Sequence, residues 1–234
     1  MLICRGSRAA HQSYNSEMLG TLKRHLRSRL DQWAIQRDLQ HLVEELAQSQ
    51  QCSFTEDWMS KHIEHWRQDF AKFAGHPGLQ MLEIGSYEGR SAVWFLENIV
   101  THPTSRLVCV DVFSDSRQRM RFDHNVKCCR AEARVDKRSG RSEAVLSQLR
   151  GQSFDLIYVD GSHDAPFVLL DGMLSWELLK AGGILAFDDY QWKPELPPER
   201  RPQLAIDLFL RGHAGKYKLM RQDDQVVIEK KEEL

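Results

Sequence analysis

The sequence lacks any apolar run of the roughly 18 residues that a membrane-spanning helix requires, so no transmembrane segment is predicted. It also lacks an excess of charge of one sign, because 32 lysines and arginines face 33 aspartates and glutamates. The formal net charge of -1 gives no overall field that would attract nucleic acid or an anionic membrane surface. These absences favour a protein that acts on a small molecule, with neither nucleic acid nor a membrane as partner.

Cysteine is scarce, and the five cysteines show no C-x-x-C spacing, which argues against a disulfide framework and against a zinc site. The first residues have no apolar core long enough for a secretion signal, so we expect a cytoplasmic location. Residues 1–30 carry six lysines and arginines but only one acid, Glu17, a composition that leaves organelle targeting open as an alternative.

The N-terminal part of the chain has a helical pattern. No periodicity is visible in the first 15 or so residues, and we expect no regular structure there. Apolar residues then recur every three or four positions between residues 19 and 46, which predicts one long or two consecutive amphipathic helices. Such helices need a partner for their apolar face, and they could cover an acceptor site or pair two subunits into a homodimer.

A further helix is predicted before the main domain. Ser53 with Glu56 has the spacing of a capping box, which predicts that a helix opens there and ends near Gly75. His62 and His65 lie off the apolar stripe of this helix and are expected in solvent. We therefore assign residues 1–74 to a helical extension or cap and residues 75–234 to the main domain.

Beyond residue 79, short apolar runs alternate with helical patterns, as βαβ units require. The run YKLMR, then QDDQ, then VVIEK predicts a closing antiparallel hairpin. The expected fold is α/β, a doubly wound Rossmann-like sheet of seven strands, mostly parallel with an antiparallel last strand. We place the other strands near residues 80–84, 106–110, 133–137, 155–159 and 183–187, and helices near 90–100, 117–125, 142–150, 166–180 and 202–212.

Two glycines stand between the first strand and its helix in LQMLEIGSYEGRSAVWFLENI. Gly85 and Gly89 allow a sharp turn and a close approach of the backbone to a ligand. Their G-x-x-x-G spacing departs from the dinucleotide fingerprint, which weakens the case for NAD. Ser91 lies in the first helical turn, where a hydroxyl and free N–H groups can hold the carboxylate of an amino acid.

The second strand, RLVCV, ends at Asp111, 22 residues after Gly89. An acid at this strand tip lies beside the glycine turn in a doubly wound sheet, where it can accept hydrogen bonds from a ribose diol. The alternative is that Asp111 caps the following helix.

Together these segments resemble the class I S-adenosylmethionine-dependent methyltransferases. The string DWMSKHIEHW…LEIGSYEGRSAVWFLENI…FDLIYVDGSHD…LLKAGGILAFDDY is similar to a branch of small-molecule O-methyltransferases related to antibiotic-pathway enzymes, over about residues 53–230. The resemblance implies S-adenosylmethionine as cofactor, with Asp111 on its ribose hydroxyls and SGRSEAVLSQL as the turn that faces adenine. The residues implicated in cofactor binding, besides Ser91, are Glu83, Gly85, Ser86, Tyr87, Gly89, Asp111, Gly140, Arg141, Ser142 and Asp160.

Three carboxylates follow two neighbouring strands. Asp160 ends FDLIYV, and Asp188 and Asp189 end GGILAF, so all three reach the carboxyl edge of the predicted sheet. Carboxylates this close together repel each other, and they either take up protons or hold a cation. Because oxygen ligands suit hard ions, we predict a divalent metal site, Mg²⁺ in the first instance. For Asp188 and Asp189 the alternative is capping of the next segment.

The carboxylates also resemble the metal site of catechol-type O-methyltransferases, which implies that an ion bound there orients the acceptor oxygen. This sequence departs from that family in two places. Asp189 stands where the family commonly has an amide, and His163 stands near the position of a basic lysine. Histidine ordinarily titrates near neutral pH, so His163 can take a hydroxyl proton as a catalytic base, with Asp160 beside it. The alternative for His163 is an ordinary surface histidine.

The sequence therefore predicts a metal-assisted O-methyltransferase acting on a small hydroxylated acceptor. Two alternatives remain open: a metal-independent methyltransferase that uses His163 as base, and a methyltransferase-like protein that binds the cofactor without turnover. Trp58, Tyr190 and Trp192 are candidates for the walls of the acceptor site, since aromatic faces favour a sulfonium cation.

Overall fold

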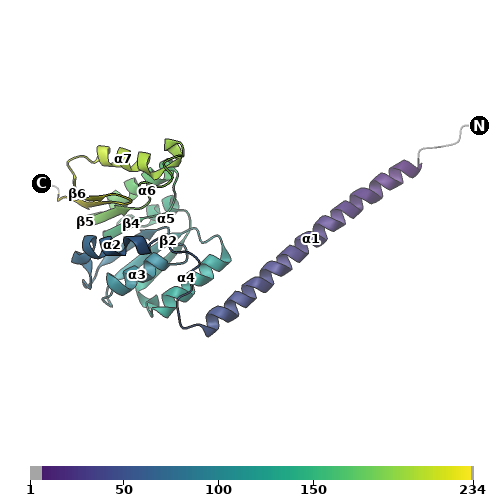
Figure 1. Ribbon diagram of the computed structural model, residues 1–234, viewed down its shortest axis with the longest axis horizontal. Helices are drawn as coiled ribbons and strands as arrows, with labels where there is room; N and C mark the ends of the chain where they lie inside the picture. Colours follow the sequence, from purple (N-terminus) through teal and green to yellow (C-terminus); the bar gives the residue numbers. More distant parts are fainter. Residues whose placement is uncertain (1–6, 233–234) are drawn as a thin grey trace, which may run out of the picture. The chain divides into compact units, whose positions relative to one another are not determined.

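The computed structural model describes residues 7–232, with side chains described from residue 27 onward. The chain divides between Ser49 and Gln50 into two compact units. The first contains one helix, α1 (Ser7–Gln48), which begins earlier than the sequence pattern suggested (Figure 1). Leu30 and Trp33 of α1 are exposed. The described helices include none with the length and apolar character needed to cross a bilayer.

The second unit contains a seven-stranded sheet in the order β3-β2-β1-β4-β5-β7-β6. The first five strands are parallel, and β7 pairs antiparallel with β5 and β6. The Rossmann-like fold predicted from the alternation of apolar runs and helical patterns is thereby confirmed. The strands are β1 (Gln80–Ile84), β2 (Arg106–Asp111), β3 (Val135–Ser139), β4 (Phe154–Val159), β5 (Leu179–Phe187), β6 (Tyr217–Gln222) and β7 (Val226–Lys230).

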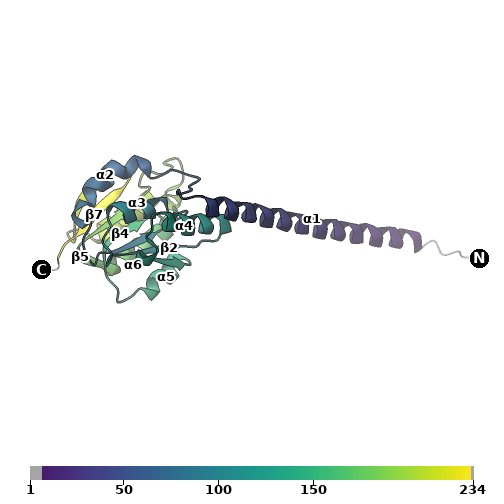
Figure 2. The ribbon, with the colours of Figure 1, turned by 90° about the horizontal axis from the view of Figure 1, so that it is seen from below.

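Helices cover both faces of this sheet, and each face has its own apolar core (Figure 2). One core takes its helical residues from α2 (Ile63–Asp69), α3 (Arg90–Asn98) and α4 (Ser116–Cys128). The other takes them from α5 (Ser142–Gln148), α6 (Ala165–Leu178) and α7 (Pro202–Gly212). Short 3-10 turns complete the unit at η1 (Ser60–His62), η2 (Ala71–Phe73), η3 (Glu132–Arg134) and η4 (Pro198–Arg200).

The unit boundary lies earlier than the predicted one after residue 74. Residues 50–74 belong to the second unit because their aromatic side chains fill its core: Trp66 and Phe70 are both 0% exposed. The Trp66 ring stacks on Phe95, with centroids 4.9 Å apart, and its Nε1 donates to Gln225 Oε1 at 2.8 Å. A helix stripe predicts that a face is buried, but not which core receives it.

The predicted capping box at Ser53 does not form. The Ser53 backbone N–H donates to Asn125 Oδ1 at 2.7 Å, which ties the segment to α4, and helical structure begins only at Ser60. The helix expected from there to residue 74 is split into η1, α2 and η2. His62, expected in solvent, is 3% exposed, because it lies on the buried side of this segment with its Nε2 3.6 Å from Asp188 Oδ1, while Lys61 and Glu64 face water.

Candidate active site

The glycine turn after β1 has a conformation that other residues adopt only with strain. Gly85 has φ +88°, and a Cβ at this position would stand 1.9 Å from the Asp160 carbonyl oxygen. Gly89 has φ +80°, forms the N-cap of α3, and lies against the Phe122 ring, which a Cβ would meet at 2.9 Å. The turn thus requires glycine at both positions, and it brings Gly85, which follows β1, into backbone contact with Asp160, which follows β4.

Glu83, two residues before the turn, is completely buried. Its carboxylate accepts hydrogen bonds from the Ser86 and Ser91 hydroxyls, each at 2.6 Å. Burial nevertheless raises the pKa of Glu83 to about 7. The Ser91 hydroxyl, expected to hold a ligand carboxylate, donates its single proton to Glu83 instead, so Ser91 serves to fix Glu83 inside the turn.

Asp111 holds the glycine turn from the neighbouring strand. Its Oδ2 accepts the backbone N–H groups of Ser86 and Tyr87 at 3.1 and 2.9 Å, and its Oδ1 accepts that of Phe113 at 2.9 Å. The helix-capping alternative does not apply, because Asp115 is the residue whose side chain caps α4. Asp111 therefore shapes the turn as well as facing the cavity beside it.

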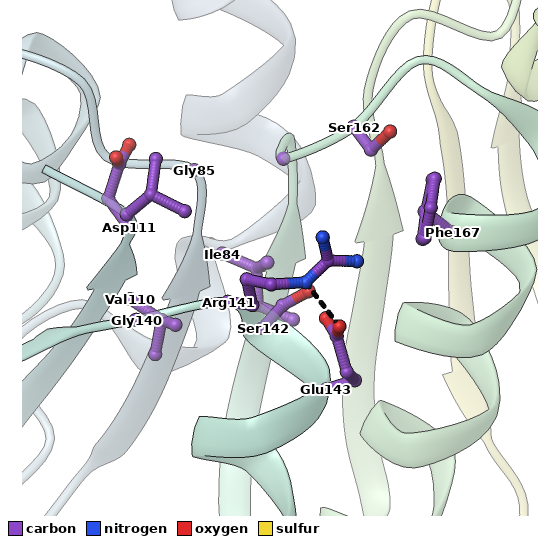
Figure 3. Close-up of a pocket in the computed structure, with 12 residues that line it drawn as sticks. Ile84, Gly85, Val110, Asp111, Gly140, Arg141, Ser142, Glu143, Ser162 and Phe167 are labelled. Atoms are coloured by element: carbon purple, nitrogen blue, oxygen red, sulfur yellow. Dashed lines mark hydrogen bonds and ion pairs between the residues drawn. The ribbon is translucent and has the colours of Figure 1, made fainter. Parts of the chain in front are cut away.

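A cavity of about 260 Å³ opens beside Asp111 at the carboxyl edge of the sheet (Figure 3). It brings together predicted cofactor residues from three separate loops: Gly85, Asp111 and the turn 140–142. Phe167 of α6 lines it too, and the Arg141 guanidinium lies 5.3 Å from the Phe167 ring centroid. The sequence predicted the helix that carries Phe167, but no pattern indicated that this residue would line a cavity. The lining residues are Ile84, Gly85, Val110, Asp111, Val112, Gly140, Arg141, Ser142, Glu143, Gly161, Ser162 and Phe167.

A second cluster lies at the tips of β4 and β5. Donor atoms of Asp160, His163 and Asp189 all lie within 4.8 Å of one another, and His163 Nε2 is 2.7 Å from Asp189 Oδ2. Burial, followed by the charges of Asp188 and Asp189, raises the pKa of Asp160 well above its usual range. Asp189 has φ +59°, a left-handed conformation that non-glycine residues seldom adopt. A group this crowded with acids is suited to holding a cation.

Asp188 does not join this group, although the sequence placed it among the metal ligands. Its Oδ2 accepts the Tyr158 hydroxyl at 2.5 Å, and its Oδ1 accepts Gln225 Nε2 at 3.0 Å and the Asp189 backbone N–H at 2.8 Å. Buried His62 places Nε2 3.6 Å from the same Oδ1. Both residues lie beyond β5, which ends at Phe187, and the backbone is left-handed at Asp189. Asp188 thereby enters a polar network with Tyr158 and Gln225, while Asp189 faces His163.

Aromatic side chains stand beside the acidic cluster and beside the glycine turn. The Trp192 ring stacks on His163, with centroids 4.2 Å apart and planes 23° apart, which limits the orientations open to the imidazole. Trp58 is 62% exposed and lies 5.1 Å from the ring centroid of Tyr87, a residue of the glycine turn. Tyr190, the third predicted wall, directs its hydroxyl to Asp207 of α7 at 2.9 Å and packs into the core.

The part of the chain that contains the cavity and the cluster of Asp160, His163 and Asp189 resembles known proteins. Residues 82–190, which run from β1 past the tip of β5, match the family model described as a methyltransferase domain. A candidate O-methyltransferase of Mycobacterium sp. (strain JLS) is 28% identical over 106 residues, 45% of this chain and 46% of that protein. A second curated relative matches this chain over 63% of its own length. The chain therefore spans less than two thirds of the length of either curated protein.

Solved structures share the fold at low identity. The O-methyltransferase from Bacillus cereus in complex with SAH has 15% identity and a TM-score of 0.59, with 82% of this chain and 90% of that chain covered. The MycE methyltransferase from the mycinamycin biosynthetic pathway, in complex with Mg, SAH and mycinamycin VI, has 16% identity and a TM-score of 0.55, with 83% and 53% covered. At this level of identity, the likeness shows that this chain shares the fold of these proteins.

Proposed function

We propose that this chain, a class I S-adenosylmethionine-dependent methyltransferase, transfers the methyl group to a hydroxyl oxygen of a small acceptor with the help of a divalent cation. The observation that carries the proposal is the backbone contact between Gly85 and Asp160. It joins the glycine-turn cavity to the cluster of Asp160, His163 and Asp189. A methyl donor in the first and an acceptor at the second would be close enough for in-line transfer, which depends chiefly on placement.

The cavity residues suit an adenosyl ligand. Asp111 stands at the end of β2, where an acid can accept from ribose hydroxyls, while Ser142 and Phe167 line another part of the cavity. Bound S-adenosylmethionine would supply a methyl group on a sulfonium. The chain's contribution is to hold the nucleoside between the strand tips and to keep water from the reacting atoms.

The donor set of the second cluster fits a divalent ion, since two carboxylates and one imidazole converge there. A cation in this place would lower the pKa of the acceptor hydroxyl and orient its oxygen. Including His163 in place of Asp188 makes the donor set less suited to Mg²⁺, because an imidazole nitrogen suits ions such as Fe²⁺ and Zn²⁺. Mn²⁺ binds carboxylates as Mg²⁺ does and tolerates one nitrogen ligand. The MycE structure, which is a complex with Mg, supports a divalent ion in a protein of this fold.

A second candidate is a metal-independent methyltransferase with His163 as base. The 2.7 Å contact between His163 Nε2 and Asp189 Oδ2 favours it, because a carboxylate that orients an imidazole is the usual support for a histidine base. In that case Asp189 fixes the ring, and Trp192 restricts it from the side.

The test is methyl transfer from methyl-labelled S-adenosylmethionine to catechol-like acceptors and to a cell extract, with and without a chelator. The proposal expects a labelled small molecule, loss of labelling with chelator, and recovery on adding Mn²⁺ or Mg²⁺. Labelling that persists after metal removal supports the second candidate. Cofactor binding without labelling of any molecule in the extract would leave the binding protein as the better account.

Replacing His163 by alanine separates the two mechanisms. If His163 is a ligand, the Mn²⁺ concentration for half-maximal turnover should rise by roughly 10- to 100-fold, as when metal-site geometry is disturbed, and saturating Mn²⁺ should restore most of the rate. The measurement is turnover across a metal titration. A rate that stays low at every metal concentration, and recovers as pH rises because hydroxide replaces the missing base, would contradict the ligand role.

The acceptor class, the cytoplasmic location, the absence of nucleic-acid and membrane partners, and pairing of two subunits through the N-terminal helix stay predictions of the sequence. Acceptor specificity in such a fold resides in the loops around the site.

A further inference from the structure

The loop that carries Asp189 is held from one side by the turn of the β6–β7 hairpin. Gln225, the residue before β7, is completely buried, and its Nε2 donates to Asp188 Oδ1 at 3.0 Å. The backbone N–H of Tyr190 donates to the Asp224 carbonyl oxygen at 2.8 Å. Asp189 therefore lies between two residues that are both tied to the same hairpin turn.

Trp66 fixes the direction of the Gln225 amide. An indole N–H can only donate, and Trp66 Nε1 donates to Gln225 Oε1 at 2.8 Å. The amide nitrogen must then point the other way, where its two N–H groups meet Asp188 Oδ1 at 3.0 Å and the Tyr158 hydroxyl oxygen at 3.1 Å. Reversing the amide would set its N–H groups against the indole N–H and leave buried donors without acceptors.

Asp188 passes this restraint on to Asp189. The Tyr158 hydroxyl donates to Asp188 Oδ2 at 2.5 Å, and Gln225 donates to Oδ1, so both oxygens of the carboxylate are held. The same Oδ1 accepts the backbone N–H of Asp189 at 2.8 Å. Asp189 has φ +59°, and a strained backbone of this kind persists only where the surroundings fix it. The hydrogen bonds to Asp188 and to the hairpin turn supply that restraint.

The restraint decides what the Asp189 side chain faces. Its Oδ2 lies 2.7 Å from His163 Nε2, in the cluster of Asp160, His163 and Asp189. If the Asp188 carboxylate were free to turn, the left-handed backbone of Asp189 would lose the acceptor of its N–H group. The Asp189 side chain would then no longer be directed at His163. Gln225, which is not itself part of the cluster, thereby controls its geometry.

We infer that Gln225 is a positioning residue of this cluster: its amide, held by Trp66, fixes Asp188 and thereby the backbone of Asp189, so that the Asp189 carboxylate meets His163. The inference rests on the proposed function for the role of the cluster, since a bound cation and a histidine base both need Asp189 in this place. It gives the β6–β7 hairpin, predicted only as the closing element of the sheet, a part in the active site.

The first test observes the His163 imidazole nitrogens by NMR in the metal-free protein at fixed pH, with His163→Ala to assign the signal. Gln225→Met keeps the length of the side chain but removes both N–H donors. The contact with Asp189 should then be lost, and the Nε2 resonance of His163 should move. Gln222→Met is the matched control, because Gln222 lies on the same hairpin but donates to the Tyr190 hydroxyl at 3.0 Å and to no acid of the loop. It should leave the resonance in place.

The second test measures Mn²⁺ affinity from the electron paramagnetic resonance signal of free Mn²⁺, with S-adenosylhomocysteine present. Gln225→Met should raise the dissociation constant of Mn²⁺ by about tenfold or more, as when a group that orients a metal ligand is lost, and keep S-adenosylhomocysteine affinity within about twofold. Gln222→Met should change neither affinity. Tyr158→Phe removes the other donor to Asp188 and should act in the same direction as Gln225→Met. It decides the question if Gln225→Met does not fold.

A merely structural role for Gln225 would lower the melting temperature but leave the His163 resonance and the Mn²⁺ affinity as in the wild-type protein. That result would overturn the inference, and so would an equal change in the Gln222→Met control. If the wild-type protein binds no Mn²⁺, the cation of the proposed function is wrong, and the His163 resonance alone decides whether Gln225 positions the cluster.

Discussion

Asp160→Asn is expected to reduce metal-dependent turnover by about a hundredfold or more while leaving S-adenosylhomocysteine affinity within about twofold. The asparagine keeps the shape of the side chain but removes one of the two anionic donors of the cluster. The Asp160 side chain is not among those that line the cofactor cavity, so binding of the nucleoside should persist. Turnover and calorimetry on the same preparation measure the two effects separately.

The same substitution should make the metal-free protein more stable. Folding raises the pKa of Asp160, so the ionised carboxylate is less stable in the folded protein than in the unfolded chain, and its destabilising effect grows as pH rises through the usual range of an aspartate. Asparagine cannot ionise, so the melting temperature near neutral pH without metal should increase by about 2 to 4 °C.

Asp164→Asn is the control, since Asp164 is an exposed acid four residues further on that forms an ion pair with Arg200 at 3.7 Å. It should change neither turnover nor stability measurably. Full turnover by Asp160→Asn would remove the cation from the mechanism. Loss of cofactor binding in parallel with turnover would show that Asp160 acts on the nucleoside instead.

Gly85→Ala is expected to cost roughly 4 kcal/mol or more of folding free energy, or to prevent folding altogether. Two effects add. The left-handed backbone at φ +88° strains any residue with a Cβ, and that Cβ would stand 1.9 Å from the Asp160 carbonyl oxygen, a backbone atom that cannot rotate away. Denaturant unfolding measures the loss, and any folded fraction should fail to bind S-adenosylhomocysteine because the turn has moved.

Gly215→Ala separates the two effects. Gly215 has nearly the same backbone angle, φ +84°, but nothing within 4 Å of its added Cβ. It should cost only about 1 to 2 kcal/mol, the price of the conformation alone. If both variants lost the same folding free energy, the Cβ added at position 85 would not clash with the Asp160 carbonyl oxygen. Gly85 would then lie farther from Asp160 than in the structure.

The parts of the site that follow from strand order could be predicted from the sequence. Gly85, Asp111 and Asp160 each come directly after a short apolar run, and in a parallel sheet the carboxyl ends of neighbouring strands meet at one edge. The pattern of apolar runs therefore fixed which loops would gather, even though the loops are far apart in the chain.

What the sequence could not predict depends on the direction of single side chains and on contacts between distant segments. Asp188 and Asp189 are adjacent and chemically identical, and only the partners Tyr158 and Gln225, contributed by two other strands or their ends, draw the first into the core. Ser53 has the spacing of a cap but bonds to Asn125, 72 residues away. Local patterns carry no information about such partners.

The proposed function requires that one adenosyl ligand occupies the cavity between the glycine turn and Asp111. Titration calorimetry of the full chain with S-adenosylhomocysteine tests it most directly, with Asp111→Ala beside the wild type. We expect one site per chain, weakened about tenfold or more by Asp111→Ala, which removes the acceptor for the ribose and for the N–H groups of Ser86 and Tyr87. No binding to the wild-type protein, or binding that the substitution leaves unchanged, would contradict it.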